Sequence, residues 1–382
     1  MLVFQTSMML FRFSYIYVSI IITTRIYNLT QTMCNFLPSC SAMIKTFQAV
    51  YQEGNFMPTQ EKTISSDGKS TISIKIAGVG GGGISVLKGV AEEELSESIE
   101  LAAINTDARS FNGLSPTIKT LQIGKDITNG YGTGGHWEIG DLSARQDKTL
   151  LQDLLHDTDM LFITAGFGGG AGSGIAPVLA QMAKEQDILT VAVVTEPFSF
   201  EGTQRKNTAV NALKRIENEV DALIVIQNDS LMLLPEAKKL TIKDAFKLTD
   251  AVLKKAVNLI TEIINTTGDV NIDFADIKTI LRQSPLSDAV FTMGSDSTGN
   301  IYQAMEQACN SPLLKSSING ARGVILYIIG NEDMSMYDIN TAIMKLKEHL
   351  SDDANLIWGY LGDHASDGNV RVMLIATDFL RN

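Results

Sequence analysis

One short run of the chain, residues 168–174, constrains its fold more than any other, because five of its seven residues are glycine. An apolar segment with the character of a strand precedes it at 159–165, and a helical pattern follows at 175–184. Backbone N–H groups in such a loop are not obstructed by Cβ atoms, and the positive end of the helix dipole lies behind them. A flexible turn needs only one or two glycines, so the run indicates a phosphate-binding loop.

A second glycine run, at 78–83, lies between a β-rich segment at 72–77 and a segment at 84–90 that can begin a helix. Neither run ends in Gly-Lys-Ser/Thr, so neither is a Walker loop. The second run does have Gly-x-Gly-x-x-Gly spacing, which is also found in dinucleotide-binding folds. An oxidoreductase that uses a dinucleotide therefore stays open as an alternative, although no catalytic His or Tyr constellation accompanies the motif.

The composition narrows the classes of ligand. The chain has 382 residues, room for two domains, and a formal net charge of −12, which argues against nucleic acid as a partner. A nucleotide is still compatible with this charge if Mg²⁺ supplies the missing positive charge. Cys34, Cys40 and Cys309 have no metal-ligand spacing, which predicts no protein-held metal site and a reducing, cytoplasmic compartment.

The first part of the chain differs from the rest. Within the stretch at 8–24, which is rich in Phe, Tyr, Ile and Val, the longest uncharged run is residues 13–24. It is too short to span a bilayer and the stretch lacks a basic start, so no membrane insertion is expected. Codons for Gln52-Glu53-Gly54 can contain the purine-rich sequence with which bacterial ribosomes pair, just upstream of Met57. We therefore expect residues 1–71 to be an extension that is partly disordered or not natively translated, with Met57 as a possible start.

Strand and helix patterns alternate through the first half of the chain. Expected strands lie at 101–104, 121–123, 160–165, 188–195 and 222–226, with helices at 151–156 and 206–221 and a glycine-rich loop at 130–140. This order predicts an α/β fold with a parallel sheet covered on both faces, whose ligand lies at the carboxyl ends of the strands. Residues 72–240 would form this nucleotide-binding domain.

An uninterrupted helical pattern at 241–265 follows, with Gly268 just beyond it, and indicates a long central helix. It would connect the first domain to a smaller α/β domain at 266–382. Expected elements of that domain are helices at 274–282 and 337–350 and strands at 323–329, 355–361 and 369–377.

Several motifs occur in the order of one known family. Besides the two glycine runs they are Asn-Thr-Asp-Ala at 105–108, Thr-Glu-Pro-Phe-Ser-Phe-Glu-Gly at 195–202, Asn-Asp at 228–229, Asp-Ala-Phe at 244–246, Asn-Ile-Asp-Phe-Ala-Asp at 271–276, Ser-Pro-Leu-Leu at 311–314 and Gly-Ala-Arg-Gly-Val at 320–324. From about residue 72 to residue 379 the chain resembles FtsZ, the bacterial tubulin-like cell-division GTPase.

The resemblance implies a GTP site made of identifiable residues. The backbone around the phosphates would come from Gly81, Gly82, Gly83, Ile84, Ser85, Gly169, Gly170, Ala171, Gly172, Ser173 and Gly174. Glu201 would accept from the ribose hydroxyls, and Arg205 would lie near the phosphates. Phe246 would lie against the guanine ring, while Asp250, helped by Asn228, would accept from the guanine N1–H and amine.

Asp273 and Asp276 share a face at the start of the expected helix at 274–282. The helix dipole alone favours acidic residues there, which is a purely structural explanation. The resemblance implies instead that this loop, oriented by Asn271, enters the pocket of the next subunit and positions a water against the γ-phosphate. Hydrolysis would then accompany head-to-tail assembly into filaments of the mid-cell division ring, with the chain itself as main partner and other division proteins as possible ones.

Some positions depart from the family pattern. Ser85 replaces an asparagine that contacts the base, Ile84 replaces a glycine, and Gly-Gly-His-Trp-Glu at 134–138 replaces an Ala-Asn-Pro-Glu loop near the γ-phosphate. A structural filament scaffold that binds GTP with weak turnover is therefore the alternative. Because the chain ends soon after the last expected strand, we also expect it to lack the peptide by which most of the family binds membrane tethers.

Overall fold

The computed structural model describes residues 72–92, 95–232, 241–265, 268–284, 288–311, 318–363 and 368–379. The predicted extension with Met57, and most of the 311–314 motif, lie outside these residues. None of the helices in the described ranges combines the length and the apolar character needed to cross a bilayer.

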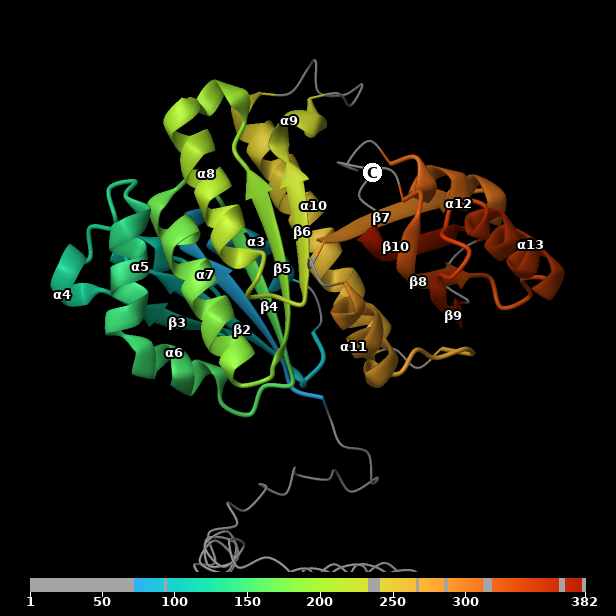
Figure 1. Ribbon diagram of the computed structural model, residues 1–382, viewed down its shortest axis with the longest axis horizontal. Coiled ribbons are helices and arrows are strands. Elements are labelled where there is room, and N and C mark those ends of the chain that lie inside the picture. The colour runs from blue at the N-terminus through green and yellow to red at the C-terminus, as the bar shows by residue number, and fades with distance from the viewer. Residues whose placement is uncertain are drawn as a thin grey trace, which may run out of the picture. The chain divides into compact units, whose positions relative to one another are not determined.

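Ten strands of the described residues form a single sheet in the order β3-β2-β1-β4-β5-β6-β7-β10-β8-β9 (Figure 1). They are β1 (Ile74–Val79), β2 (Ile99–Asn105), β3 (Ile118–Gln122), β4 (Met160–Gly166), β5 (Leu189–Glu196), β6 (Ala222–Gln227), β7 (Asp288–Asp296), β8 (Ala321–Gly330), β9 (Asn355–Gly362) and β10 (Val370–Phe379). The first six strands are parallel, as predicted. Beyond them β7 is parallel to β6, and β10 runs antiparallel to both of its neighbours.

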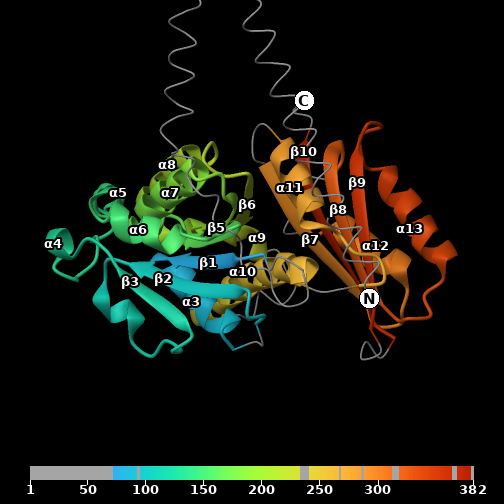
Figure 2. The same cartoon turned by 90° about the horizontal axis from the view of Figure 1, so that it is seen from below.

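Helices cover both faces of the parallel part of the sheet (Figure 2). One face packs against α3 (Gly80–Val90) and α10 (Ile242–Asn265), and the other against α5 (Trp137–Gln146), α6 (Lys148–Leu155), α7 (Gly170–Glu185) and α8 (Thr203–Ile216). The strands between them are therefore buried on both sides, which explains why β1, β4 and β5 are mostly apolar and do not alternate between apolar and polar residues.

The sheet continues past β6, the last strand of the predicted nucleotide-binding domain. Two residue pairs, Leu223 with Asp288 and Ile224 with Ala289, join β6 to β7 and continue the sheet into the second half of the chain. One hydrophobic core then runs from Ile74 on β1 to Met373 on β10, under α10 and α11 (Phe274–Gln283). A further core lies on the other side of β8 and β10, against α12 (Ile301–Cys309) and α13 (Met336–Lys347).

The predicted elements differ from the structure in several respects. The helices expected from 84 and 175 begin earlier, at Gly80 and Gly170, so most of each glycine run is helical. The predicted loop at 130–140 is wrong at its end, because α5 begins at Trp137. Neither β7 nor α12 was predicted. The burial pattern of β7 is irregular, whereas α12 is a short helix whose buried residues, from Ile301 to Cys309, recur at three- and four-residue steps.

Candidate functional site

A cavity of about 950 Å³ opens at the carboxyl ends of the parallel strands. The turns that leave β1, β2, β4, β5 and β6 contribute to its lining, together with the loop at 131–135 and the first half of α10. This is the position that a parallel sheet predicts for a ligand, because all of these strands end at the same edge.

The two glycine runs contact each other beside the cavity. A Cβ on Gly80, whose φ is +70°, would lie 2.8 Å from the backbone nitrogen of Gly172. A Cβ on Gly82 would lie 3.2 Å from the backbone nitrogen of Gly166. Only glycine lets these backbones approach so closely, and the contact places the N-termini of α3 and α7 side by side.

Two other glycines in the runs are not required by packing. A Cβ on Gly81 or on Gly169 would meet nothing within 4 Å, and neither residue has a positive φ. Both residues line the cavity. The fold does not require glycine at these two positions, which lie at the start of a helix and face open space. Without a Cβ, the backbone N–H of each residue is accessible to an anion. The cradle therefore fits the phosphates of a nucleotide.

Some residues predicted to surround the phosphates lie behind the cradle. Gly83 and Ile84 are buried in α3, and Ser173 and Gly174 are buried in α7; none of the four lines the cavity. The Ser173 hydroxyl accepts a hydrogen bond from the backbone N–H of Gly168 at 2.9 Å. The other predicted members of the two runs, Gly81, Gly82, Ser85, Gly169, Gly170, Ala171 and Gly172, do line it.

One end of the cavity has the side chains suited to a base. Phe246 on α10 is partly exposed and lies edge-on to Phe198, with ring centroids 5.5 Å apart. The Ser85 hydroxyl donates to Oδ2 of Asp250 at 2.5 Å. Burial raises the pKa of the Asp250 carboxyl, although the bond from Ser85 opposes this shift. Ser85, which stands where the family has an asparagine, therefore contacts the carboxylate directly.

The other predicted polar groups lie on the same side of the cavity. Glu201 accepts from the backbone N–H of Phe198 at 2.9 Å and forms an ion pair with Arg205. Asn228, which is buried at the end of β6, accepts from the hydroxyl of Thr249 at 3.2 Å. Its amide N–H₂ remains a donor for a ligand.

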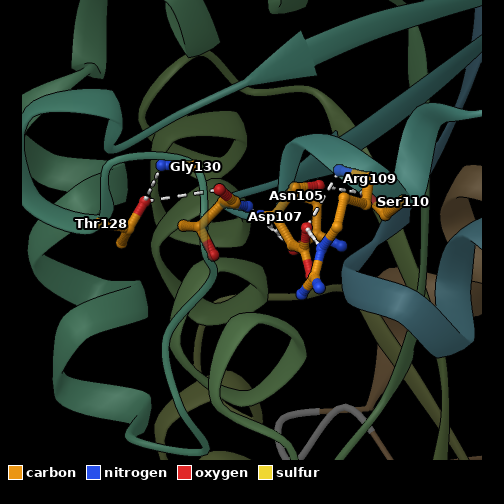
Figure 3. Close-up of polar contacts among 7 residues, drawn as sticks. Asn105, Asp107, Arg109, Ser110, Thr128 and Gly130 are labelled. Carbon is orange, nitrogen blue, oxygen red and sulfur yellow. Dashed lines mark hydrogen bonds and ion pairs between the residues drawn. The ribbon is translucent and has the colours of Figure 1, made fainter.

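The opposite wall contains residues that the sequence analysis did not select. Asp107 and Arg109, in the turn after β2, line the cavity together with Tyr131 and Thr133 (Figure 3 shows the turn). The motif at 105–108 was recognised as part of the resemblance, and its place directly after a strand was the signal that could have identified Asp107. Nothing in the sequence marked Tyr131, which comes from the irregular loop before α5.

The predicted catalytic residues lie elsewhere. Asp273 is the N-cap residue of α11, Asp276 is in its first turn, and Asn271 accepts from the backbone N–H of Gly268 at 2.5 Å. None of the three lines the cavity. Arg282 on α11 contacts Asp187 at 2.9 Å and Asp221 at 3.0 Å, residues just before β5 and β6. The helix therefore lies beside the amino ends of these strands (Figure 1), whereas the cavity lies at their carboxyl ends.

Within the described ranges, no three His, Cys, Asp or Glu side chains are grouped to hold a metal ion. Mg²⁺ is usually bound through one or two carboxylates, water and the phosphates of the substrate itself. The cavity, in which five charged side chains face the glycine cradle, fits an ion that arrives with a nucleotide better than a resident metal.

Known proteins share this architecture. Residues 73–234 match the Tubulin/FtsZ family GTPase domain, and residues 287–380 match the FtsZ family C-terminal domain. The chain is 42% identical to the cell division protein FtsZ of Aquifex aeolicus over 80% of its own length and 83% of that protein. An FtsZ dimer from M. jannaschii superposes with a TM-score of 0.74 at 36% identity, covering 80% of this chain and 88% of that one. CetZ2 from Haloferax volcanii shares the fold. It is 20% identical and superposes with a TM-score of 0.69, covering 81% of this chain and 94% of that one.

Proposed function

Since the chain belongs to the FtsZ family of tubulin-like cell-division GTPases, we propose that it binds GTP in the described cavity and hydrolyses it where a second copy completes the site. The glycine cradle would hold the phosphates, with Gly81 and Gly169 giving their N–H groups. Phe246 and Asp250 would bind the guanine, because the carboxylate accepts from two donors that adenine does not present on that edge. Family membership argues against the dinucleotide oxidoreductase alternative.

The observation that carries the proposal is the separation of the two sets of residues. The cavity lies at the carboxyl ends of the strands, and Asp273 and Asp276 lie on α11 at their amino ends. One copy stacked on another along the strand direction would bring the acidic turn of the first against the cavity of the second. Such a heterologous contact does not close on itself and builds a filament.

In this arrangement each group of the acidic turn has a defined task. Asp273 is exposed and Asp276 is half-buried, so both carboxylates are accessible to a neighbouring copy. They would orient a water for attack on the γ-phosphate and accept its proton, while Asn271 holds the loop. Mg²⁺ would neutralise charge on the phosphates. The FtsZ relative from M. jannaschii is described as a dimer, which supports self-association.

The filament would serve the division ring, and the expected location is the cytoplasm at mid-cell. This part of the proposal rests on the relative from Aquifex aeolicus, which is a cell division protein. No direct membrane insertion and no nucleic-acid partner are proposed, and other division proteins remain candidate partners.

Phosphate release measured over a range of protein concentrations tests the shared site. The activity per subunit should rise with concentration, because only contacts between copies are competent. Asp276→Ala should reduce the rate of phosphate release per subunit about a hundredfold or more, while GTP binding is retained. Asp338→Ala is the matched control, since Asp338 is likewise a half-buried carboxylate in the first turn of a helix, α13.

Two outcomes would contradict the proposal. Equal activity per subunit in dilute monomer and in concentrated protein would place the whole site within one copy. Filaments that form with GTP but release no phosphate in the unmodified chain would favour the scaffold with weak turnover, for which the contact between Ser85 and Asp250 is the relevant departure from the family.

A further inference from the structure

Arg109 is a cation on the cavity wall that has no part in the site assigned so far. It belongs to the 3₁₀ helix η2 (Ala108–Phe111), which follows β2 and has Asp107 as its N-cap residue. The Arg109 guanidinium forms two hydrogen bonds with the Asp107 carboxylate, from Nε at 3.0 Å and from Nη2 at 2.8 Å (Figure 3). Its side chain is nevertheless 73% exposed, so the pair faces the open cavity.

The turn that presents Arg109 is rigid although the side chain is exposed. The amide oxygen of Asn105 accepts from the backbone N–H of Thr106 at 2.8 Å, and Ser110 Oγ donates to the carbonyl of Asp107 at 2.6 Å. Asp107 also accepts from the backbone N–H of Arg109 at 2.9 Å. The backbone of the turn is therefore fixed by these bonds, and the exposed guanidinium is the group that can change partner.

A chain of contacts links this turn to the glycine cradle. Asp107 forms a β-bridge with Tyr131, and the loop continues to Thr133. The hydroxyl of Thr133 lies so close to Gly170 that a Cβ there would be 2.0 Å from it. The turn is thus held against the N-terminus of α7, where the phosphates are proposed to bind.

The strand order shows which phosphate lies nearest to Arg109. The groups proposed for base and ribose come from β5, β6 and α10, on one side of the central strands β1 and β4. Arg109 follows β2, on the other side. A nucleotide whose base lies at Phe246 and whose phosphates cross the cradle therefore points its terminal phosphate towards the turn after β2.

We propose that Arg109 binds the terminal phosphate of the bound triphosphate, leaving Asp107 to do so, and thereby distinguishes GTP from GDP. The inference rests on the proposed function, since it assumes that the cavity takes a guanine nucleotide. The fork of an arginine matches a phosphate as well as a carboxylate, so one pair of hydrogen bonds replaces another. GDP ends one phosphate earlier, beyond the reach of the guanidinium, and leaves it on Asp107.

Two features of the chain support an exchange of partners. The cavity lining within the described ranges contains two cations, Arg109 and Arg205, and each is held by a neighbouring carboxylate. The hydrogen bonds from Arg109 hold the pKa of Asp107 below its ordinary value, so the carboxylate stays ionised and is available whenever the phosphate leaves. An exposed ion pair of this kind costs little to break.

Nucleotide titrations of the full chain test the inference. A fluorescent GDP and a fluorescent non-hydrolysable GTP analogue are titrated, with Mg²⁺, into protein too dilute to assemble. Arg109→Gln should weaken binding of the triphosphate about tenfold and change GDP binding less than about twofold, the loss expected for a charged hydrogen bond. Arg109→Lys, which keeps the charge without the fork, should recover part of the loss.

The control is Arg145→Gln, which removes another exposed arginine paired with a nearby aspartate, Asp141, outside the cavity. It should change neither affinity. Arg109→Gln could leave the ratio of the two affinities unchanged, either by changing neither or by weakening the binding of both nucleotides equally. In that case the inference is wrong while the proposed function stands. If the unmodified chain binds neither nucleotide, the proposed function itself has failed.

Discussion

Among single residues, Asp250 is one whose proposed role in binding guanine would oppose the stability of the folded chain. Burial raises the pKa of its carboxyl above the ordinary value, and the Ser85 hydroxyl offsets only part of this. A raised pKa means that the folded protein holds the proton more tightly than the unfolded chain. The carboxyl therefore contributes stability below its unfolded pKa, and this contribution is lost as the pH rises through the folded pKa. At neutral pH the ionised side chain carries a desolvation cost.

The expected consequence is that Asp250→Asn stabilises the nucleotide-free protein while weakening GTP binding. Asparagine has the same shape and no charge to desolvate. At pH 7 the melting temperature should rise by about 1–3 °C, and the gain should disappear as the pH falls below the ordinary carboxyl range. Thermal unfolding at both pH values, without nucleotide, measures this. A lower melting temperature at pH 7 would show that the carboxylate is structurally needed.

At the scale of elements, α5 and α7 cross where two glycines meet. A Cβ on Gly174 would lie 2.2 Å from the carbonyl oxygen of Trp137, and one on Gly140 would lie 2.6 Å from that of Gly170. Gly174 was predicted to wrap a phosphate, but in the structure its hydrogen side chain lets two helices pack. The glycine run therefore combines the helix contact at Gly174 with the proposed anion access at Gly169.

Alanine substitutions should separate these two requirements. Gly174→Ala gains up to about 1 kcal/mol of helix propensity but forces a methyl group into backbone, which costs about 1–3 kcal/mol or more, so net destabilisation is expected. Gly169→Ala meets open space and should change the stability of the nucleotide-free protein by less than about 0.5 kcal/mol. Denaturant unfolding of both variants provides the comparison, and equal losses would refute the assignment.

The sequence predicted elements well where one physical pattern dominates. The strands β1, β4 and β5 are buried on both faces and therefore mostly apolar without alternation, and α10 has an unbroken helical period. The start of α7 was placed too late, because glycine has a low helix propensity and the contacts that hold it helical are tertiary. The same limit applies to the site. The glycine cradle was predicted because it follows the ends of strands, whereas the positions of Arg109 and Tyr131 depend on the pairing of Asp107 with Tyr131, a tertiary contact between two turns.

For the whole molecule, the continuous sheet fixes the distance between the two proposed half-sites. The cavity at one edge and α11 at the other are joined through β5 and β6, with Arg282 bonded to the turns before both strands. Neither half-site can reach the other within one copy, so their separation is built into the fold. This predicts that defects in the two half-sites complement each other between copies.

A mixing experiment follows from this separation. Asp276→Ala subunits keep an intact cavity, and Asp250→Ala subunits keep an intact acidic turn. Each variant alone should release almost no phosphate. In an equal mixture with random order along a head-to-tail filament, about a quarter of the contacts join an intact cavity to an intact turn, so about a quarter of normal activity should return. The control is the double variant Asp250→Ala/Asp276→Ala, mixed in the same ratio with Asp276→Ala subunits. This mixture must restore no activity, because no subunit in it has an intact acidic turn. Recovery of activity there would place the hydrolytic groups outside α11.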